Sequence, residues 1–291
     1  MKRIDANRYY NTYHGHSECD LESVYEELCK YNEPIVFLCG DSSLDNKYWV
    51  LDERGKALNG YDKVLDPPVA RFDVCYCMNR EIVYRGLKLK VINAAVEATT
   101  LSDRKRNLLP QDRFVKGKIS PKDYLIVSIG GNDVVLKPSF WTVVSLLSLV
   151  YWSSIESIEN GTAYGIDHFV DLFKTQVETY IGKLTQHHLP KTIFVCMIYY
   201  PCESKRSPSW ADTSLSLLRY NSHPKKIQAA IQAMFRLATS KVCIQGTKVV
   251  PIALYDVLDE KHDTDYVARV EPSAGGAEKM AHTFIDKIQN F

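Results

Sequence analysis

The sequence predicts one doubly wound α/β domain, in which a five-stranded parallel sheet carries helices on both faces. Five short apolar runs rich in β-branched residues are its candidate strands: 35–39, 89–94, 124–129, 192–198 and 248–253. Helix-like stretches lie between or beside them, at 21–30, 169–185, 226–240 and 277–290. Because apolar strands that alternate with helices form parallel sheets covered on both sides, this is the simplest architecture for the whole chain, residues 1–291.

Local patterns predict individual elements. In the stretch 169–185 the apolar residues recur every three or four positions, which is the helical period. Cys75-Tyr76-Cys77 alternates as a strand would, with both thiols on one face. The run FWTVVSLLSLVYW, residues 140–152, is apolar all round, so it is either core or the wall of an apolar pocket, and core is favoured.

Composition argues against several classes of protein. Hydrophobic residues make up 45% and charged residues 24%, and the net charge of +1 provides no general attraction to nucleic acid or an anionic membrane. Basic runs such as Arg104-Lys105-Arg106 are short and typical of solvated surface. No apolar run reaches the ~20 residues of a membrane span, and no signal peptide is recognisable. The eight scattered cysteines are then expected to be reduced thiols in a cytoplasmic protein.

The residues that follow the predicted strands are the candidate site residues, because ligands of open parallel sheets bind outside the carboxyl ends of the strands. The first run is followed by Gly40-Asp41-Ser42-Ser43, and the third by Gly130-Gly131-Asn132-Asp133. The second run leads into VINAAVEATT, residues 91–100. Each segment alone is a weak signal, since such residues occur in any loop. Together they place a hydroxyl and an amide at one edge of a sheet.

These segments resemble the sequence blocks of the SGNH (GDSL-type) hydrolases, in the family's order. Residues 40–42 match the first block, 91–100 the second and 130–133 the third, and EPSAGGAEKMA, residues 271–281, resembles the last. The likeness therefore extends over nearly the whole chain. It implies a flavodoxin-like SGNH-hydrolase fold and hydrolysis of an ester, with no cofactor and no metal.

The resemblance also implies roles for single residues. Ser42 corresponds to the nucleophile, which reacts only when a base takes its proton. The backbone N–H groups of Ser42 and Ala98 and the side-chain amide of Asn132 correspond to the oxyanion hole, whose donors are worth ~3 kcal/mol each. The family usually has glycine where this chain has Ala98, and alanine is expected there only with a negative φ.

The last block departs from the family, which carries Asp-x-x-His there. The alignment places Glu271 at the histidine and Ala268 at the aspartate. One hypothesis makes Glu271 the base, with a pKa raised by burial. A second assigns the base to His262, oriented by Asp263 or Asp265. A third treats the chain as a ligand-binding module that has lost the chemistry. Weak hydrolysis through Ser42 and Glu271 is narrowly favoured.

The segments 134–190 and 199–225 are expected to cover the substrate, a small ester of a carbohydrate or a lipid. Two geometric predictions follow. Ser42, Ala98 and Asn132 should share one small pocket. Pro272-Ser273 should start the terminal helix, with Gly275-Gly276 letting it approach the sheet, so that the Glu271 carboxylate lies within about 3 Å of Ser42 Oγ or one water away.

Overall fold

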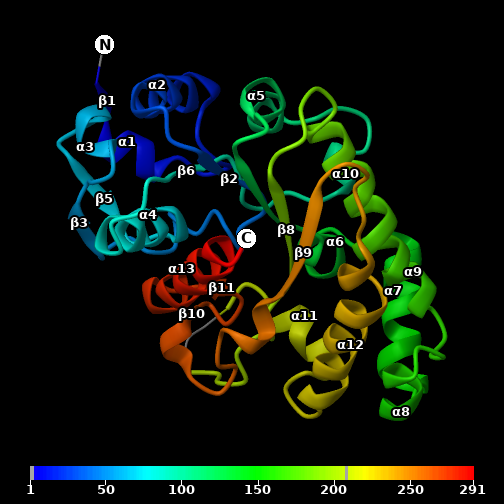
Figure 1. Ribbon diagram of the computed structural model, residues 1–291. Helices are drawn as coiled ribbons and strands as arrows, with labels where there is room; N and C mark the ends of the chain where they lie inside the picture. The colour runs from blue at the N-terminus through cyan, green and yellow to red at the C-terminus, as the bar shows by residue number, and fades with distance from the viewer. Residues whose placement is uncertain (1–2, 207–208) are drawn as a thin grey trace.

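The computed structural model describes residues 3–206 and 209–291, and its centre is a sheet of five parallel strands in the spatial order β6-β2-β7-β8-β9 (Figure 1). The strands are β2 (Ile35–Gly40), β6 (Lys90–Asn93), β7 (Tyr124–Ser128), β8 (Thr192–Met197) and β9 (Lys248–Ala253). Each forms from one of the predicted runs. In chain order this is the 2-1-3-4-5 arrangement of doubly wound folds, so the predicted fold class is confirmed.

Helices cover both faces of the sheet, which is why its central strands are apolar on both sides. The larger ones are α2 (Glu18–Leu28), α4 (Val74–Tyr84), α5 (Pro110–Lys118), α10 (Val177–Leu184), α12 (Pro224–Leu237) and α13 (Ala274–Gln289). α4 and α13 pack together on one face, and α2, α5 and α10 lie on the other (Figure 1). All residues of β2 and β8 are buried, whereas the edge strand β9 alternates in exposure.

Short elements complete the N-terminal half and the last loop. They are α1 (Ala6–Asn11), α3 (Tyr61–Val64) and the strand pairs β1 (Ile4–Asp5) with β4 (Leu65–Asp66), β3 (Arg54–Lys56) with β5 (Val69–Arg71), and β10 (Tyr266–Val267) with β11 (Glu271–Pro272). The β10–β11 pair is antiparallel and immediately precedes α13.

The predicted strand at Cys75-Tyr76-Cys77 is wrong, because these residues lie in α4. Asp73 caps this helix, and its carboxylate accepts a hydrogen bond of 2.7 Å from the Tyr76 N–H. An aspartate cap before an apolar stretch is a helix signal that outweighs a three-residue alternation.

A group of helices lies beside the sheet, formed by the chain between β7 and β9. Besides α12 it contains α6 (Gly131–Val135), α7 (Phe140–Leu147), α8 (Ile155–Glu159), α9 (Ile166–Val170) and α11 (Asp212–Leu217), with π-helical turns at Ser148–Trp152 and Asp171–Gln176. α9, the second π-helical turn and α10 run without interruption from 166 to 184, close to the predicted 169–185. None of the described helices is long and apolar enough to cross a bilayer.

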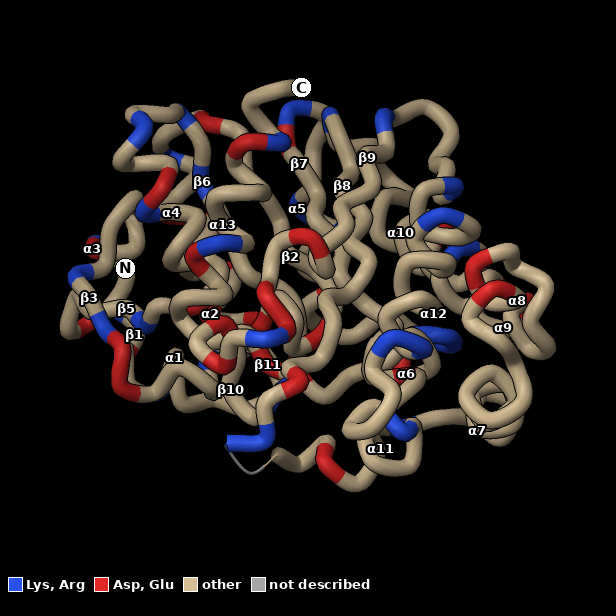
Figure 2. Tube along the Cα trace, turned by 90° about the horizontal axis from the view of Figure 1, so that it is seen from below, with Lys and Arg blue, Asp and Glu red and all other residues tan. Residues whose placement is uncertain are grey.

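The run 140–152 is not core, contrary to the favoured expectation. Phe140, Trp141 and Trp152 are 73%, 67% and 81% exposed. Charged residues are spread over much of the molecule, but α7 carries none (Figure 2). Only part of this run, including Leu146 and Leu149, faces inward, where it lines a pocket.

Candidate functional site

The two serine hydroxyls of the turn after β2 have different surroundings. Gly40 has a φ of +134°, and a Cβ there would lie 1.8 Å from the Ser128 carbonyl oxygen, so only glycine lets β2 end this close to β7. The Ser43 hydroxyl is buried, 2.7 Å from Asp41 Oδ1 and 2.6 Å from Ser128 Oγ. Ser42 is half-buried and lines a pocket. Ser42 is therefore the hydroxyl that a ligand can reach.

Glu271 lines the same pocket as Ser42. It lies in β11, which is fixed to the turn after β2 by Asn46: the side-chain amide of Asn46 donates to the Pro272 carbonyl at 3.0 Å and its oxygen accepts from the Val74 N–H at 3.0 Å. The Glu271 side chain is buried, and its Oε2 has no hydrogen-bond partner.

The environment of Glu271 favours the protonated acid. Burial raises its pKa to about 8, because a carboxylate loses hydration there. The side chains of Ser42 and Trp210 lie close enough to stabilise the charged form and offset part of this rise, whereas Asp41 adds to it. The expectation that burial would raise this pKa toward that of an imidazole agrees with this environment.

Asn132 lines the pocket from α6, at the end of the strand next to β2. Its Nδ2 donates one hydrogen bond of 3.0 Å to the Thr99 carbonyl. A primary amide has two N–H donors, so one remains for a ligand. Ser42 and Asn132 thus lie on either side of the point where the strand order reverses, which is where ligands bind in this class of fold.

Ala98 differs from what the sequence suggested. Its φ is +56°, so the expected negative φ is wrong. Glycine adopts this left-handed conformation easily, whereas for alanine it is unfavourable by about 1 kcal/mol or more. Ala98 is also not among the residues that line the pocket with Ser42 and Asn132.

Arg104 holds this second block against the first, although its basic run suggested a solvated surface. It is 1% exposed and donates to the carbonyl oxygen of Gly40 at 2.9 Å and to Thr99 Oγ1 at 2.9 Å. Its Nε lies 3.0 Å from Asp112, which is also buried. Asp112 lies in α5, eight residues after Arg104, and the sequence analysis did not predict this pair.

A second acid, Glu97, lies buried near Glu271. Neither of its carboxylate oxygens has a hydrogen-bond partner, although a fully buried ion pair, Asp45 with Lys47 at 2.7 Å, lies beside it. Burial and then Asp45 raise the pKa of Glu97 to about 8, and Lys47 opposes this. The sequence analysis missed Glu97; the signal was a single acid inside the otherwise uncharged block VINAAVEATT.

The loop before α13 carries Glu271 into the pocket, with details that differ from the prediction. Pro272 belongs to β11, and Ser273 is the N-cap whose hydroxyl accepts from the Gly276 N–H at 3.1 Å, so the helix begins at Ala274, after both of the predicted residues. A Cβ on Gly276 would lie 2.3 Å from the Asp265 carbonyl oxygen. This glycine therefore permits close approach to the preceding turn and not to the sheet.

His262 lies away from the pocket. Its side chain is 70% exposed, and its Nδ1 is 2.7 Å from Asp259 and not from the expected Asp263 or Asp265. Among the residues described, no histidine lines the pocket. Within the same described ranges, no group of three or more His, Cys, Asp or Glu side chains is placed to hold a metal ion.

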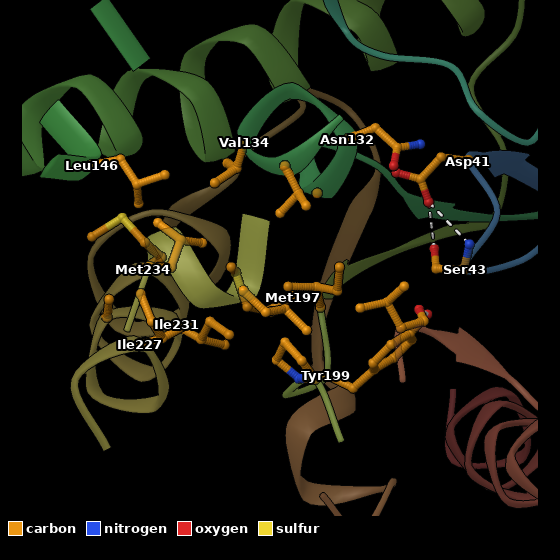
Figure 3. A pocket seen from close by; sticks show the side chains of 18 of the residues that line it. Asp41, Ser43, Asn132, Val134, Leu146, Met197, Tyr199, Ile227, Ile231 and Met234 are labelled. Atoms are coloured by element: carbon orange, nitrogen blue, oxygen red, sulfur yellow. Dashed lines mark hydrogen bonds between the residues drawn. The ribbon is translucent and has the colours of Figure 1, made fainter. Parts of the chain in front are cut away.

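Beyond these polar groups the pocket is apolar. Figure 3 shows Asp41, Ser43 and Asn132 at one end, and Leu146, Ile227 and Met234 at the other. The walls come mainly from the helices between β7 and β9: Val134, Val135, Leu146, Leu149, Phe169, Phe173, Leu215, Leu218, Ile227, Ala230, Ile231 and Met234. The space between them, including the mouth, is about 1040 Å³. Its apolar lining suits a hydrocarbon chain whose polar end lies at Ser42.

Comparison with known proteins gives only distant similarities. No protein-family model and no curated protein matches the chain. Among solved structures, an extracellular lipase from Streptomyces rimosus is 11% identical, with a TM-score of 0.45 over 87% of this chain and 99% of the lipase. A family 3 carbohydrate esterase from Clostridium thermocellum is 14% identical, with a TM-score of 0.42 over 88% and 98%.

A lipase from a goat rumen metagenome is also 14% identical, with a TM-score of 0.47 over 87% of this chain and 96% of the lipase. At such TM-scores and identities these similarities do not establish a family or an activity for this chain.

Proposed function

We propose that this chain is a divergent member of the SGNH hydrolase family, a serine-dependent hydrolase of an ester with an apolar acyl group. The observation that carries the proposal is that Ser42 and the buried acid Glu271 line one pocket, whose remaining walls are apolar. The whole chain would be one such domain, in which 134–190 and 199–225 supply the cover. Its eight unpaired cysteines support a cytoplasmic location.

In the proposed reaction Glu271, as the carboxylate, accepts the proton of Ser42 Oγ while Oγ bonds to the carbonyl carbon of the ester. The oxyanion that forms is stabilised by the Ser42 N–H and the free N–H of Asn132. Ala98 N–H stays the proposed third donor on the resemblance to the family alone, since Ala98 does not line the pocket. Glu271 then protonates the leaving alcohol, and water releases the acyl group from Ser42.

A ligand-binding module on the same fold is the second candidate. It is favoured by the pKa of Glu271, about 8, since most of this acid is protonated at neutral pH and cannot accept the serine proton. Such a protein would bind an apolar ligand and leave it unchanged.

Turnover of p-nitrophenyl butyrate and octanoate by the wild type and Ser42→Ala, at pH 7 and pH 9, distinguishes the two. If the chain is a hydrolase, the wild type turns over these esters faster than Ser42→Ala does, and the difference is larger at pH 9 than at pH 7. A wild type no faster than Ser42→Ala at either pH contradicts hydrolysis. Binding of a fluorescent fatty acid by both proteins would then identify the module.

A further inference from the structure

α7 and the π-helical turn after it are amphipathic in the inverse sense. The buried side of α7 and its junction with the turn carries small polar residues, Thr142, Ser145 and Ser148, and the turn also buries Leu149 and Val150. The outward side carries large apolar residues, which we call the aromatic face: Phe140, Trp141, Val143, Leu147, Tyr151 and Trp152, with Leu217 of α11 beside Tyr151. A helix in contact only with water would show the opposite pattern.

The inversion is built into the packing of α7 on α9. Thr142 Oγ1 lies 2.9 Å from His168 Nε2, so the buried hydroxyl has a partner. Gly165, just before α9, lies so close to Ser145 that a Cβ there would be 2.8 Å from the Ser145 backbone. The small side chains are needed for this close contact, and the large ones are left outside.

The helical segment that carries the aromatic face also forms part of the wall of the proposed acyl pocket. Leu146 and Leu149, on the inner side of the same helix, line the pocket that contains Ser42. Trp210, which also lines the pocket, is 40% exposed. An acyl chain that leaves an apolar phase next to the aromatic face would therefore be surrounded by apolar side chains again in the pocket.

Charge favours a lipid surface as the occupant of this face. From residue 134 to 155 the only charged residue is Lys137, and there is no acid. The guanidinium of Arg219 lies 4.8 Å from the centre of the Tyr151 ring, at the border of the face. Glu156, on α8, is the nearest acid along the chain. Tryptophan and tyrosine, flanked by basic side chains, are typical of protein surfaces that lie in the bilayer interface.

We propose that the aromatic face docks on the surface of a lipid bilayer, with the side chains of Phe140, Trp141 and Trp152 in the interface. The docked protein would take an ester-linked acyl chain from the bilayer into the pocket. The delivery step rests on the proposed function, whereas the docking itself does not. The chain would lie on the bilayer and not cross it.

The test is co-sedimentation with vesicles of phosphatidylcholine and a minor fraction of phosphatidylglycerol. The variant Phe140→Ser/Trp141→Ser/Trp152→Ser removes the face. The matched control, Leu51→Ser/Val83→Ser/Tyr84→Ser, removes three apolar side chains that are also exposed, at 47%, 51% and 86%, outside α7. Wild type and control are expected to sediment with the vesicles and to show a blue shift of tryptophan emission. The face variant should lose about tenfold or more in partitioning.

Three outcomes overturn the proposal. In the first the wild type stays in the supernatant, and in the second the face variant sediments as the wild type does. In the third outcome, the wild type and the control are dimers in solution and the face variant is a monomer. The last would show that a second copy covers the face. Ser42→Ala separates docking from catalysis, because it should sediment fully. If neither the wild type nor the control variant hydrolyses an ester, but the face variant alone fails to sediment with vesicles, the proposed function fails and the docking proposal stands.

Discussion

Replacement of Glu271 by glutamine tests the proposed base most directly. Glutamine has nearly the same size and can still hydrogen-bond to Ser42, but it cannot take a proton. Removing the base of a serine nucleophile typically lowers turnover by roughly 10⁴ to 10⁶, and the remainder comes from the oxyanion hole and binding. Glu271→Gln is expected to fall in this range with the fold intact.

The pH dependence of kcat/KM gives a second quantitative test of Glu271 as the base. With a pKa of about 8, roughly one tenth of Glu271 is carboxylate at pH 7 and roughly nine tenths at pH 9. Because only the carboxylate accepts the proton, kcat/KM of the wild type should rise about tenfold between these values and then level off. An imidazole base of ordinary pKa would already have reached its plateau near pH 7.5.

The assay is hydrolysis of p-nitrophenyl butyrate from pH 6 to pH 10, with the rate of Ser42→Ala subtracted as background. His262→Ala should retain the wild-type profile, and circular dichroism should show that each variant is folded. The reasoning is refuted by a Glu271→Gln protein with wild-type turnover, by a flat wild-type profile between pH 7 and pH 9, or by loss of activity in His262→Ala.

Further predictions concern the surroundings of the site. Glu97→Gln removes a charge that raises the pKa of Glu271, so the activity rise should move to lower pH. The pKa of Glu97 is about 8 in the folded state, above its ordinary value of 4.5, so the wild type loses stability as the pH rises from about 4.5 to 8 and this acid ionises. At pH 9 the free energy of unfolding of Glu97→Gln in urea should therefore exceed that of the wild type by on the order of 4 kcal/mol. Ala230→Trp fills the pocket and should lower kcat/KM for an octanoyl ester by about tenfold or more, and for an acetyl ester little. Arg104→Met leaves Asp112 buried without its partner and should cost about 3–5 kcal/mol, whereas exposed Lys105→Met should cost almost nothing; equal midpoints would contradict this.

The sheet could be predicted from the sequence because its signal is local. Four of the five strands, β2, β6, β7 and β8, bury both faces and appear as short apolar runs, and the turns after β2 and β7 carry polar residues of the candidate site. Ser42 and Asn132 could be proposed as site residues in this way because each lies in the turn that follows a strand.

The parts that failed depend on contacts far along the chain. Arg104 looked like surface, and only the Gly40 carbonyl and Asp112 make its burial favourable. The run 140–152 looked like core, because hydropathy records how apolar a side chain is and not whether anything covers it. The conformation of Ala98 likewise follows from the loop that holds it and not from the residue type.

The contact of Asn46 with Pro272 joins residues that are 226 positions apart. The proposed nucleophile and the proposed base therefore come from opposite ends of the chain, and loop closure over such a separation is slow and late in folding. Every intermediate without the β10–β11 pair and α13 in place has Ser42 but no Glu271 beside it. During synthesis, the nascent chain would expose its serine turn long before the acid leaves the ribosome, so ester hydrolysis would begin only when the last helix has docked.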